Sequence, residues 1–299
     1  MTLTLQGILG PVTTPFAANG ELDRAGYERN IRAHLSSGLS GVVVAGSTGE
    51  APLLDSAERE GLVEWARKVV PDDRLLIAGV GAESTRTKLH HTERAAQRGA
   101  DAVLVIAPHY FGSAMTDEAL RAHFLRVADE SRVPVLLYNN PKYMHFRLSP
   151  TLVQELSRHE NVPGMKDSTG DRALFEQYMT SHGPRFTVLT GNGTFIKVAI
   201  EMGAPGGIIA AALFAPELCV DVVEAVQRGD AATAAELQTR LTPLARVIVG
   251  DLGPAGVKAA LDCVGLAGGE ARPPLPPLSR EDRDRVRQLL RDAELPVAA

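Results

Sequence analysis

The sequence predicts a (β/α)8 barrel that carries a C-terminal helical appendage. Eight short apolar runs recur between residues 7 and 212, and segments with helical signatures lie between them. Several runs are continuously apolar, as in Val103-Leu104-Val105-Ile106. Continuous runs indicate strands that are buried on both faces, which is typical of a parallel sheet covered by helices. Beyond residue 228 only helices are indicated, so the alternation stops there.

The predicted strands are the apolar runs themselves. They are residues 7–16, 41–46, 75–81, 102–108, 133–140, 162–168, 186–192 and 206–212. The intervening helices are expected at residues 22–37, 55–70, 84–99 and 116–131, from residue 149, and at 171–182, 194–202 and 215–228. Asp55 is a suitable N-cap residue, and Pro150 suits the first position of a helix.

The last 71 residues are predicted to form a dependent appendage. Helical patterns cover residues 231–249, 256–264 and 279–294, and a proline-rich connector at 272–277 precedes the third. So short a segment with a modest apolar face is marginal as an independent domain. We therefore divide the chain into a catalytic barrel, residues 1–228, and a helical appendage, residues 229–299.

Composition limits the class of protein. The 299 residues are 44% hydrophobic, which allows a large core, and the formal net charge of −5 argues against a nucleic-acid partner. Two cysteines form neither a disulfide framework nor a cysteine-based zinc site. No apolar run approaches the roughly 20 residues of a membrane span, and no signal peptide is visible. A cytoplasmic enzyme without a membrane partner is expected.

Lys166 is the leading candidate for a catalytic residue. Barrel enzymes place their active sites at the C-terminal ends of the strands. The chain has six lysines: Lys68, Lys88, Lys142, Lys166, Lys197 and Lys258. Four fall in predicted helices, where a solvated charge is expected, and Lys142 falls in a loop. Burial disfavours the ammonium form, and a desolvated neutral amine is a nucleophile for Schiff-base chemistry. The alternative is a structural lysine that reaches solvent or pairs with Asp167.

Other strand ends offer hydroxyl and amide groups. Ser47-Thr48-Gly49-Glu50 follows a buried strand, and its hydroxyls and backbone N–H groups suit a carboxylate, although a plain turn is the alternative. Tyr138 ends the fifth run and is expected across the barrel from Lys166, where its phenol can relay protons. Packing roles remain open for Tyr138 and for Tyr110, which follows the fourth run. Asn192 ends the seventh run.

The histidines do not indicate a metal site. His90 and His91 fall in a polar helix and are expected at the surface, and the others are scattered without a pair at ligand spacing beside a carboxylate. A metal-dependent aldolase is therefore disfavoured, and no cofactor is predicted.

Three motifs resemble one family. They are Gly46-Ser47-Thr48-Gly49-Glu50, Tyr138-Asn139-x-Pro141 and Gly164-Met165-Lys166-Asp167-Ser168. In this order they resemble the dihydrodipicolinate synthase/N-acetylneuraminate lyase family, over essentially the whole chain. That family performs metal-free Schiff-base chemistry on pyruvate and related 2-oxo acids. The resemblance implies that Lys166 forms the Schiff base, that Tyr138 transfers protons, and that Ser47 and Thr48 bind the carboxylate.

The same resemblance implies further roles. Tyr110 matches a tyrosine that in some members reaches into a neighbouring subunit's site. Ile209 matches a backbone position that lines the pocket, and Gly49 and Asn192 are expected beside the substrate. Members are commonly homotetramers built as pairs of dimers, so a homotetramer or a dimer is expected.

One departure bears on the substrate. Dihydrodipicolinate synthases usually carry an arginine two residues after the motif's proline. This chain has Tyr143 there, which is therefore expected to bind the substrate. Lys142 or Arg147 offers a substitute cation. Residues 79–85 and 164–171 look more like 4-hydroxy-2-oxoglutarate aldolases. Cleavage of that substrate class is therefore the first hypothesis. The alternatives are 4-hydroxy-tetrahydrodipicolinate synthase, a Schiff-base dehydratase or deaminase, and a silent 2-oxo-acid-binding homologue.

Overall fold

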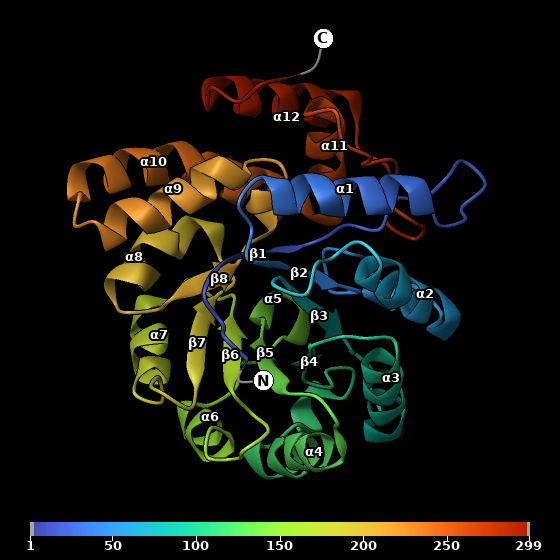
Figure 1. Ribbon diagram of the computed structural model, residues 1–299, viewed down its shortest axis with the longest axis vertical. Helices are drawn as coiled ribbons and strands as arrows, with labels where there is room; N and C mark the ends of the chain where they lie inside the picture. The colour runs from blue at the N-terminus through green and yellow to red at the C-terminus, as the bar shows by residue number, and fades with distance from the viewer. Residues whose placement is uncertain (1–2, 298–299) are drawn as a thin grey trace.

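Eight parallel strands form a closed barrel in sequence order, as the computed structural model of the chain shows (Figure 1). The structure describes residues 3–297. The strands are β1 (Gly7–Pro11), β2 (Gly41–Val44), β3 (Leu75–Gly79), β4 (Ala102–Ile106), β5 (Val135–Asn139), β6 (Gly164–Asp167), β7 (Thr187–Thr190) and β8 (Gly206–Ile208). Pairing of Ile8 with Gly207 closes the ring between β1 and β8. The predicted barrel is confirmed.

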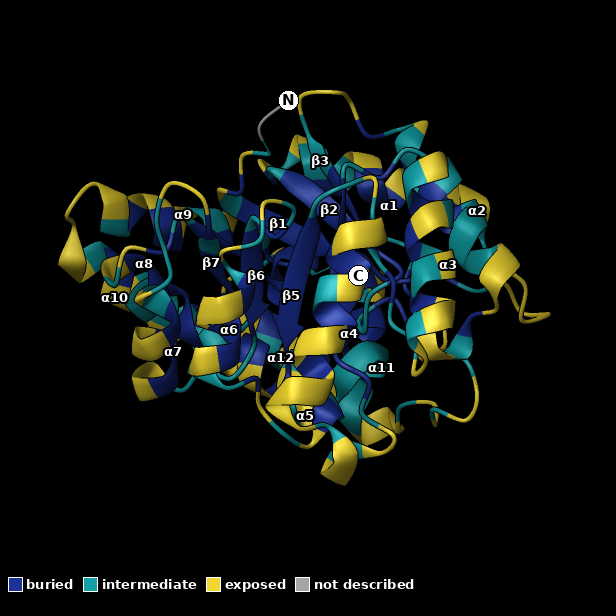
Figure 2. Cartoon of the chain, turned by 90° about the horizontal axis from the view of Figure 1, so that it is seen from below, coloured by how far each residue is buried: buried dark blue, intermediate teal, exposed yellow. Residues whose placement is uncertain are grey.

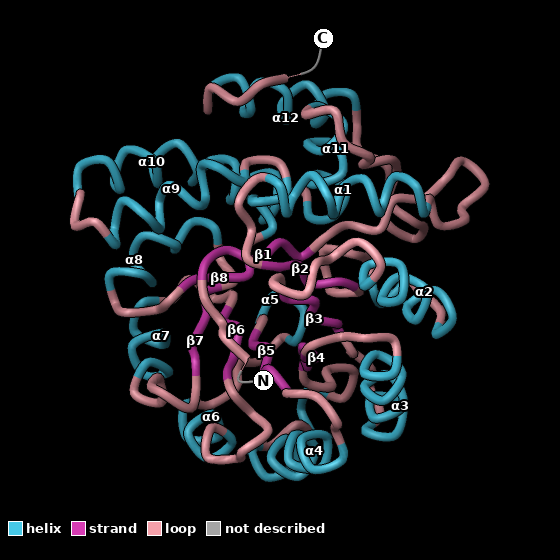
Figure 3. The backbone as a smooth tube through the Cα atoms, viewed as in Figure 1, coloured by secondary structure: helices cyan, strands magenta, loops and turns pink. Residues whose placement is uncertain are grey.

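Helices surround the strands (Figure 3). They are α1 (Arg24–Ser36), α2 (Ser56–Arg67), α3 (Thr85–Gln97), α4 (Asp117–Glu130), α5 (Pro141–Met144), α6 (Pro150–Leu156), α7 (Arg172–Met179), α8 (Ile196–Glu201) and α9 (Pro216–Gln227). The appendage adds α10 (Ala231–Pro243), a π-helix (Leu244–Asp251), α11 (Gly253–Cys263) and α12 (Arg280–Asp292). Asp55 caps α2 in a reciprocal capping box with Glu58, which explains why that helix begins there.

The continuous apolar runs lie between two hydrophobic layers. Alternate strand residues such as Leu9, Val43, Ile77 and Leu136 fill the inside of the barrel. Their neighbours on each strand pack outward against the helices, which expose only their outer faces (Figure 2). Both faces of every strand are therefore buried, as the sequence pattern indicates.

Several elements differ from the predicted ones. The strands are shorter than the apolar runs, because the chain leaves the barrel after Pro11 in β1 and after Ile208 in β8. The single helix expected at residues 231–249 divides at Pro243. Proline lacks an N–H and removes one α-helical hydrogen bond, and the chain continues in the wider turns of a π-helix. The predicted loop after β5 contains the short helix α5.

The appendage shares its hydrophobic core with the barrel. Leu241, Leu244, Ile248, Val257 and Leu261 are buried in one continuous cluster with the outer layer of the barrel. In Figure 1 the appendage covers one side of the barrel, with α10 against α9 and α11 against α12. The apolar face of these helices is therefore buried against the barrel rather than within a core of their own.

Two lysines contradict the expectation that helical lysines are solvated. The side chains of Lys88 on α3 and Lys258 on α11 are fully buried. Lys88 Nζ donates a hydrogen bond to the carbonyl oxygen of Ile106 at 2.5 Å, and Lys258 pairs with Glu50. Burial lowers the pKa of Lys88 to about 7. The prediction failed because both lysines point inward from their helices, toward partners that are distant in the sequence.

The buried Lys88 is expected to make stability depend on pH. Between pH 7 and 10.5 the unfolded chain holds a proton on Lys88 that the folded chain does not, so the free energy of unfolding rises with pH across this window. The variant Lys88→Met removes this penalty. We expect its melting temperature to exceed that of the wild type, with the largest gain at or below pH 7 and a smaller gain as pH approaches 10.5.

Thermal denaturation monitored by circular dichroism at several pH values measures this effect. Lys68→Met provides a control, because Lys68 is half exposed at the C-terminal end of α2 and pairs with Glu64 at the surface. A gain for Lys88→Met that increases with pH would contradict the expected linkage.

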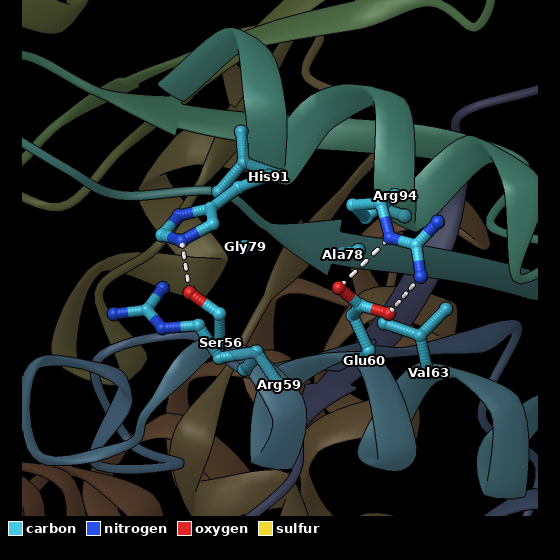
Figure 4. A pocket seen from close by; sticks show the side chains of 11 residues that line it. Ser56, Arg59, Glu60, Val63, Ala78, Gly79, His91 and Arg94 are labelled. Atoms are coloured by element: carbon cyan, nitrogen blue, oxygen red, sulfur yellow. Dashed lines mark hydrogen bonds and ion pairs between the residues drawn. The ribbon is translucent and has the colours of Figure 1, made fainter. Parts of the chain in front are cut away.

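A small cavity lies outside the barrel, between α2 and α3 (Figure 4). Glu60 binds Arg94 at 2.8 and 2.6 Å on one side of it, and Ser56 Oγ lies 3.4 Å from His91 Nε2 on the other. His90 is exposed as expected, but His91 is only partly exposed, and burial lowers its pKa to about 4. The cavity's lining includes none of the predicted site residues.

Of the helices within residues 3–297, none is both long and apolar enough to cross a membrane.

Candidate active site

Lys166 and Tyr138 lie side by side at the C-terminal mouth of the barrel. They are paired in the register between β6 and β5, and both side chains are almost fully buried. Lys166 Nζ lies 4.5 Å from the centre of the Tyr138 ring. The two residues therefore occupy neighbouring strands, and the expectation that Tyr138 lies across the barrel from Lys166 was wrong. Direct contact arises because the register places the two residues opposite each other.

Polar groups surround the Tyr138 hydroxyl. Asn140 Nδ2 donates a hydrogen bond to it at 2.7 Å, and the side chains of Ser168 and Ser47 also approach it. Burial is the largest single influence on the phenol and raises its pKa. The charge of Lys166 and the hydrogen bonds from the three polar neighbours together outweigh burial, so the pKa lies below its usual value. The site thus favours proton release from Tyr138.

Gly191 leaves space for the side chain of Lys166, and this residue was not predicted from the sequence. A Cβ atom at Gly191 would lie 2.5 Å from Lys166 Cε and would overlap Ser168 Oγ. The only sequence signal is its place at the end of a strand, beside Asn192. Because β7 pairs with β6, its backbone forms the wall against which the lysine side chain lies.

We expect Gly191→Ala to impair the site selectively. The added methyl group displaces Lys166, and a shift of about 1 Å at a reacting atom can cost roughly 10²-fold in rate. Trapping of Lys166 by a 2-oxo acid and borohydride should slow by at least about tenfold, while the far-ultraviolet circular dichroism spectrum stays unchanged. Gly183→Ala is a suitable control, because nothing lies within 4 Å of a Cβ there. Equal effects of the two variants would contradict the assignment.

Asp167 does not pair with Lys166. Its side chain lies on the opposite face of β6, where Asn139 Nδ2 and Thr169 Oγ1 donate hydrogen bonds to it at 2.8 and 2.6 Å. Burial is the main cause that raises its pKa. Asn139 also donates to the Tyr178 hydroxyl at 3.2 Å. This buried network joins β5 to β6 behind the site, and sequence reasoning did not identify it.

The turn after β2 contains three consecutive backbone N–H groups without an acceptor in the part of the chain that the structure describes. Within residues 3–297, the N–H groups of Ser47, Thr48 and Gly49 donate no hydrogen bond to the chain. Ala45 and Glu50 flank the turn and both have positive φ, 49° and 58°. Such conformations are strained for residues other than glycine and are concentrated at functional sites. Consecutive unpaired N–H groups are suited to hold an anion.

Gly49 is required by close packing. A Cβ there would lie 2.9 Å from the Val12 carbonyl oxygen, and Thr14 Oγ1 donates to the Gly49 carbonyl at 2.6 Å. The turn is thereby fixed against the residues that follow β1. Its position relative to Tyr138 is consistent with a shared site, because Ser47 reaches the phenol.

The remaining predicted residues lie at different distances from this centre. Tyr143 on α5 is half-buried, and burial followed by the charge of Tyr138 raises its pKa, so it belongs to the same mouth. Ile209 follows β8, but its N–H donates to Leu9 O at 2.9 Å. Asn192 Oδ1 accepts two hydrogen bonds from Thr194, each of 2.9 Å, and therefore supports the following turn.

Tyr110 is not brought into the site of its own chain. Its side chain is 78% exposed and packs edge-on against Phe111, while its N–H donates to Glu83 Oε2 at 2.9 Å. Among the described residues, no three His, Cys, Asp or Glu side chains are grouped to hold a metal ion.

The fold and this site define a barrel enzyme of the lyase class. A match to the model of the Dihydrodipicolinate synthetase family covers residues 4–293, and the chain belongs to this family. It is 34% identical over 288 residues to the 4-hydroxy-tetrahydrodipicolinate synthase of Methanothrix thermoacetophila, covering 95% of this chain and 96% of that protein. Over 296 residues it is also 34% identical to the enzyme of the same name from Gluconacetobacter diazotrophicus, with 98% and 99% covered.

Solved structures agree with the family. The chloride-inhibited dihydrodipicolinate synthase of Acinetobacter baumannii, in complex with pyruvate, superposes with a TM-score of 0.92 at 30% identity, covering 98% of this chain and 100% of that one. YagE of Escherichia coli K12, a family member also in complex with pyruvate, has a TM-score of 0.92 at 29% identity with the same coverage. The curated relatives are named as synthases, which does not support the closer likeness to 4-hydroxy-2-oxoglutarate aldolases.

Proposed function

We propose that the chain is a Schiff-base lyase that uses pyruvate, with Lys166 as the nucleophile. The observation that carries this proposal is the contact between Lys166 Nζ and the Tyr138 ring, 4.5 Å from its centre, at the mouth of the barrel. The pyruvate complexes of the two structural relatives support the choice of 2-oxo acid. No cofactor is needed, because the iminium itself accepts the electron pair.

The reaction proceeds through an iminium. The neutral amine of Lys166 attacks the C2 carbonyl of pyruvate, and the carbonyl oxygen leaves as water. Loss of a proton from C3 gives an enamine, and its C3 forms a bond to the carbonyl carbon of an aldehyde while the aldehyde oxygen takes up a proton. The iminium that this step restores is then cleaved by water or by an amine of the product, which releases the product and the Lys166 amine. Tyr138 moves protons to and from the reacting oxygens, and its surroundings favour proton release. The N–H groups of residues 47–49 hold the carboxylate of pyruvate.

The names of the curated relatives favour aspartate semialdehyde as the aldehyde. Both synthases named above align with nearly the whole chain at 34% identity. On this basis 4-hydroxy-tetrahydrodipicolinate synthase becomes the first candidate. The sequence alone left this activity as one of the alternatives.

Aldol cleavage of a 4-hydroxy-2-oxoglutarate type substrate is the second candidate, because of Tyr143. The usual arginine of the synthases is absent from this position. Neither substitute cation is free: Lys142 Nζ donates to Gly250 O at 2.5 Å, and Arg147 binds Asp171 at 3.1 Å. We therefore propose that the phenol of Tyr143 contacts the second substrate.

Two measurements test the proposal. Incubation with pyruvate and borohydride should add the mass of pyruvate less one oxygen atom, and peptide mapping should place it on Lys166. No adduct at Lys166 would overturn the Schiff-base assignment. A substrate panel then identifies the second reactant: aspartate semialdehyde, 4-hydroxy-2-oxoglutarate, sialic acid and 2-oxo-3-deoxy sugar acids. Products of dehydration or deamination would reject both C–C bond reactions.

We also propose a homo-oligomer, which would cover the exposed Tyr110–Phe111 pair. Tyr110 is 78% exposed and Phe111 is 68% exposed. Their rings pack in a T-shaped arrangement with 5.0 Å between the ring centres. We expect the double variant Tyr110→Ser/Phe111→Ser to shift the mass measured by light scattering toward the 31.9 kDa of one chain. A wild-type mass of 31.9 kDa would contradict the proposal.

A further inference from the structure

The carboxylate-binding turn is joined to the C-terminal appendage by a buried ion pair. Glu50, the residue that ends the turn, directs its side chain toward α11. Its Oε1 lies 2.5 Å from Lys258 Nζ on α11, and neither side chain is exposed. Its Oε2 accepts a hydrogen bond from the Arg272 backbone N–H at 2.7 Å. Both carboxylate oxygens are therefore held by the appendage.

The appendage residues in this contact are themselves fixed. Lys258 Nζ also donates to Glu270 O at 2.9 Å. The Arg272 guanidinium binds both oxygens of Glu58 at 2.7 Å, so it is anchored to the first turn of α2. Lys258 and Arg272 each lie 4.2 Å from the centre of the Phe16 ring. The two cations thus combine charge-assisted hydrogen bonds with contacts to an aromatic ring, and together these interactions favour a single arrangement of the side chains.

The backbone of Glu50 determines the shape of the turn. Its N–H donates to Ser47 O at 3.1 Å, and the N–H of Ala51 donates to Gly46 O at 3.1 Å. Both bonds close the turn around the N–H groups of residues 47–49. Glu50 has φ 58° and ψ 31°, a conformation that costs free energy for a residue with a side chain. Contacts of its carboxylate oppose relaxation of this backbone.

We propose that Glu50 and Lys258 are positioning residues for the 2-oxo acid carboxylate. The ion pair holds Glu50 in its left-handed conformation and thereby keeps the N–H groups of Ser47, Thr48 and Gly49 directed at one anion. The appendage thus contributes to substrate binding without contacting the substrate. This inference rests on the proposed function, in which those N–H groups bind pyruvate.

The test compares pyruvate with its uncharged methyl ester. The concentration of each that gives half-maximal trapping by borohydride is measured for the wild type, Lys258→Met, Lys258→Arg and the double variant Glu50→Leu/Lys258→Met. We expect Lys258→Met and the double variant to raise the pyruvate value by about tenfold or more, with the maximal trapping rate within about threefold. The methyl pyruvate value should stay unchanged. Lys258→Arg keeps the charge and should retain most of the affinity for pyruvate.

The double variant separates positioning from stability. Replacement of a buried ion pair by apolar groups often restores stability that removal of one partner loses. The melting temperature of the double variant should therefore exceed that of Lys258→Met, while the affinity of the double variant for pyruvate remains low. Glu60→Gln is the matched control, because Glu60 on α2 pairs with Arg94 and Arg98 at the neighbouring helix α3, away from the turn and from Lys258.

Each outcome is decisive. Wild-type affinity for pyruvate in a folded Lys258→Met or in the double variant would overturn the inference, as would an equal loss for methyl pyruvate. If neither variant folds, a folded Glu50→Gln, which removes the charge of the pair, should raise the pyruvate value and leave the methyl pyruvate value unchanged. An unchanged pyruvate value in that variant, or an equal loss for both ligands, would overturn the inference. Failure of the wild type to trap pyruvate would instead reject the proposed function.

Discussion

Lys166→Ala is expected to abolish covalent trapping and to reduce turnover by roughly four orders of magnitude or more, because the variant has no amine to form the iminium. The reaction offers no second route to the electron sink. The side chain is nearly fully buried beside Gly191, so the truncation leaves a small space rather than an unpaired partner. We therefore expect the fold to persist.

Mass spectrometry after borohydride treatment, together with product assays on the substrate panel, measures this loss. Lys142→Ala is the control: Lys142 also lies near the barrel mouth but is exposed and hydrogen-bonded to Gly250. Undiminished turnover in Lys166→Ala would reject Schiff-base catalysis. Turnover lost in Lys142→Ala but kept in Lys166→Ala would assign the nucleophile to α5.

Tyr138→Phe is expected to lower kcat by about 10²- to 10⁴-fold, the usual contribution of a positioned acid or base. The ring remains and still packs against Lys166, so the substitution removes only the hydroxyl. Asn140 Nδ2 loses its 2.7 Å acceptor, and Ser47 and Ser168 lose a neighbour. Melting temperature should change little compared with the change in rate.

Steady-state kinetics of the wild type and of Tyr138→Phe, measured across pH, test this expected loss of kcat. The wild type should show an ionisation that belongs to Tyr138 at a pH below the ordinary range of a phenol, and the variant should lack it. Tyr178→Phe is the comparison variant, because Tyr178 is fully buried and donates to Leu148 O in the network behind the site. A pH profile that is unchanged in Tyr138→Phe would contradict the proton-transfer role.

The barrel and the position of its proposed nucleophile could be predicted from the sequence for a clear reason. Burial of a strand on both faces produces a continuous apolar run, so a polar residue in such a run is conspicuous, and Lys166 is the only lysine in one. Contacts between strands are different. Nothing in the local pattern of residues 135–139 specifies which β6 residue each one faces, so the direct contact between Tyr138 and Lys166 could not be predicted.

Long-range partners explain the remaining failures. Lys258 resembles an ordinary helical lysine in its local sequence. Its burial depends on Glu50, which is distant in the sequence but in direct contact with it in the fold. Arg272 contacts the same carboxylate from 222 residues away. Gly191 has no distinctive local signal either, because its requirement comes from a side chain on the neighbouring strand.

The pairing of Tyr138 with Lys166 has a consequence for how this enzyme can change. Both residues are placed by main-chain hydrogen bonds between β5 and β6, whereas Tyr143 and Lys142 lie on the short helix that follows. A one-residue deletion within β6 would exchange the faces of Lys166 and Asp167 and destroy the site. Insertions or replacements in residues 141–147 leave the strand ladder intact. Substrate preference can therefore diverge in that segment while the chemistry stays fixed.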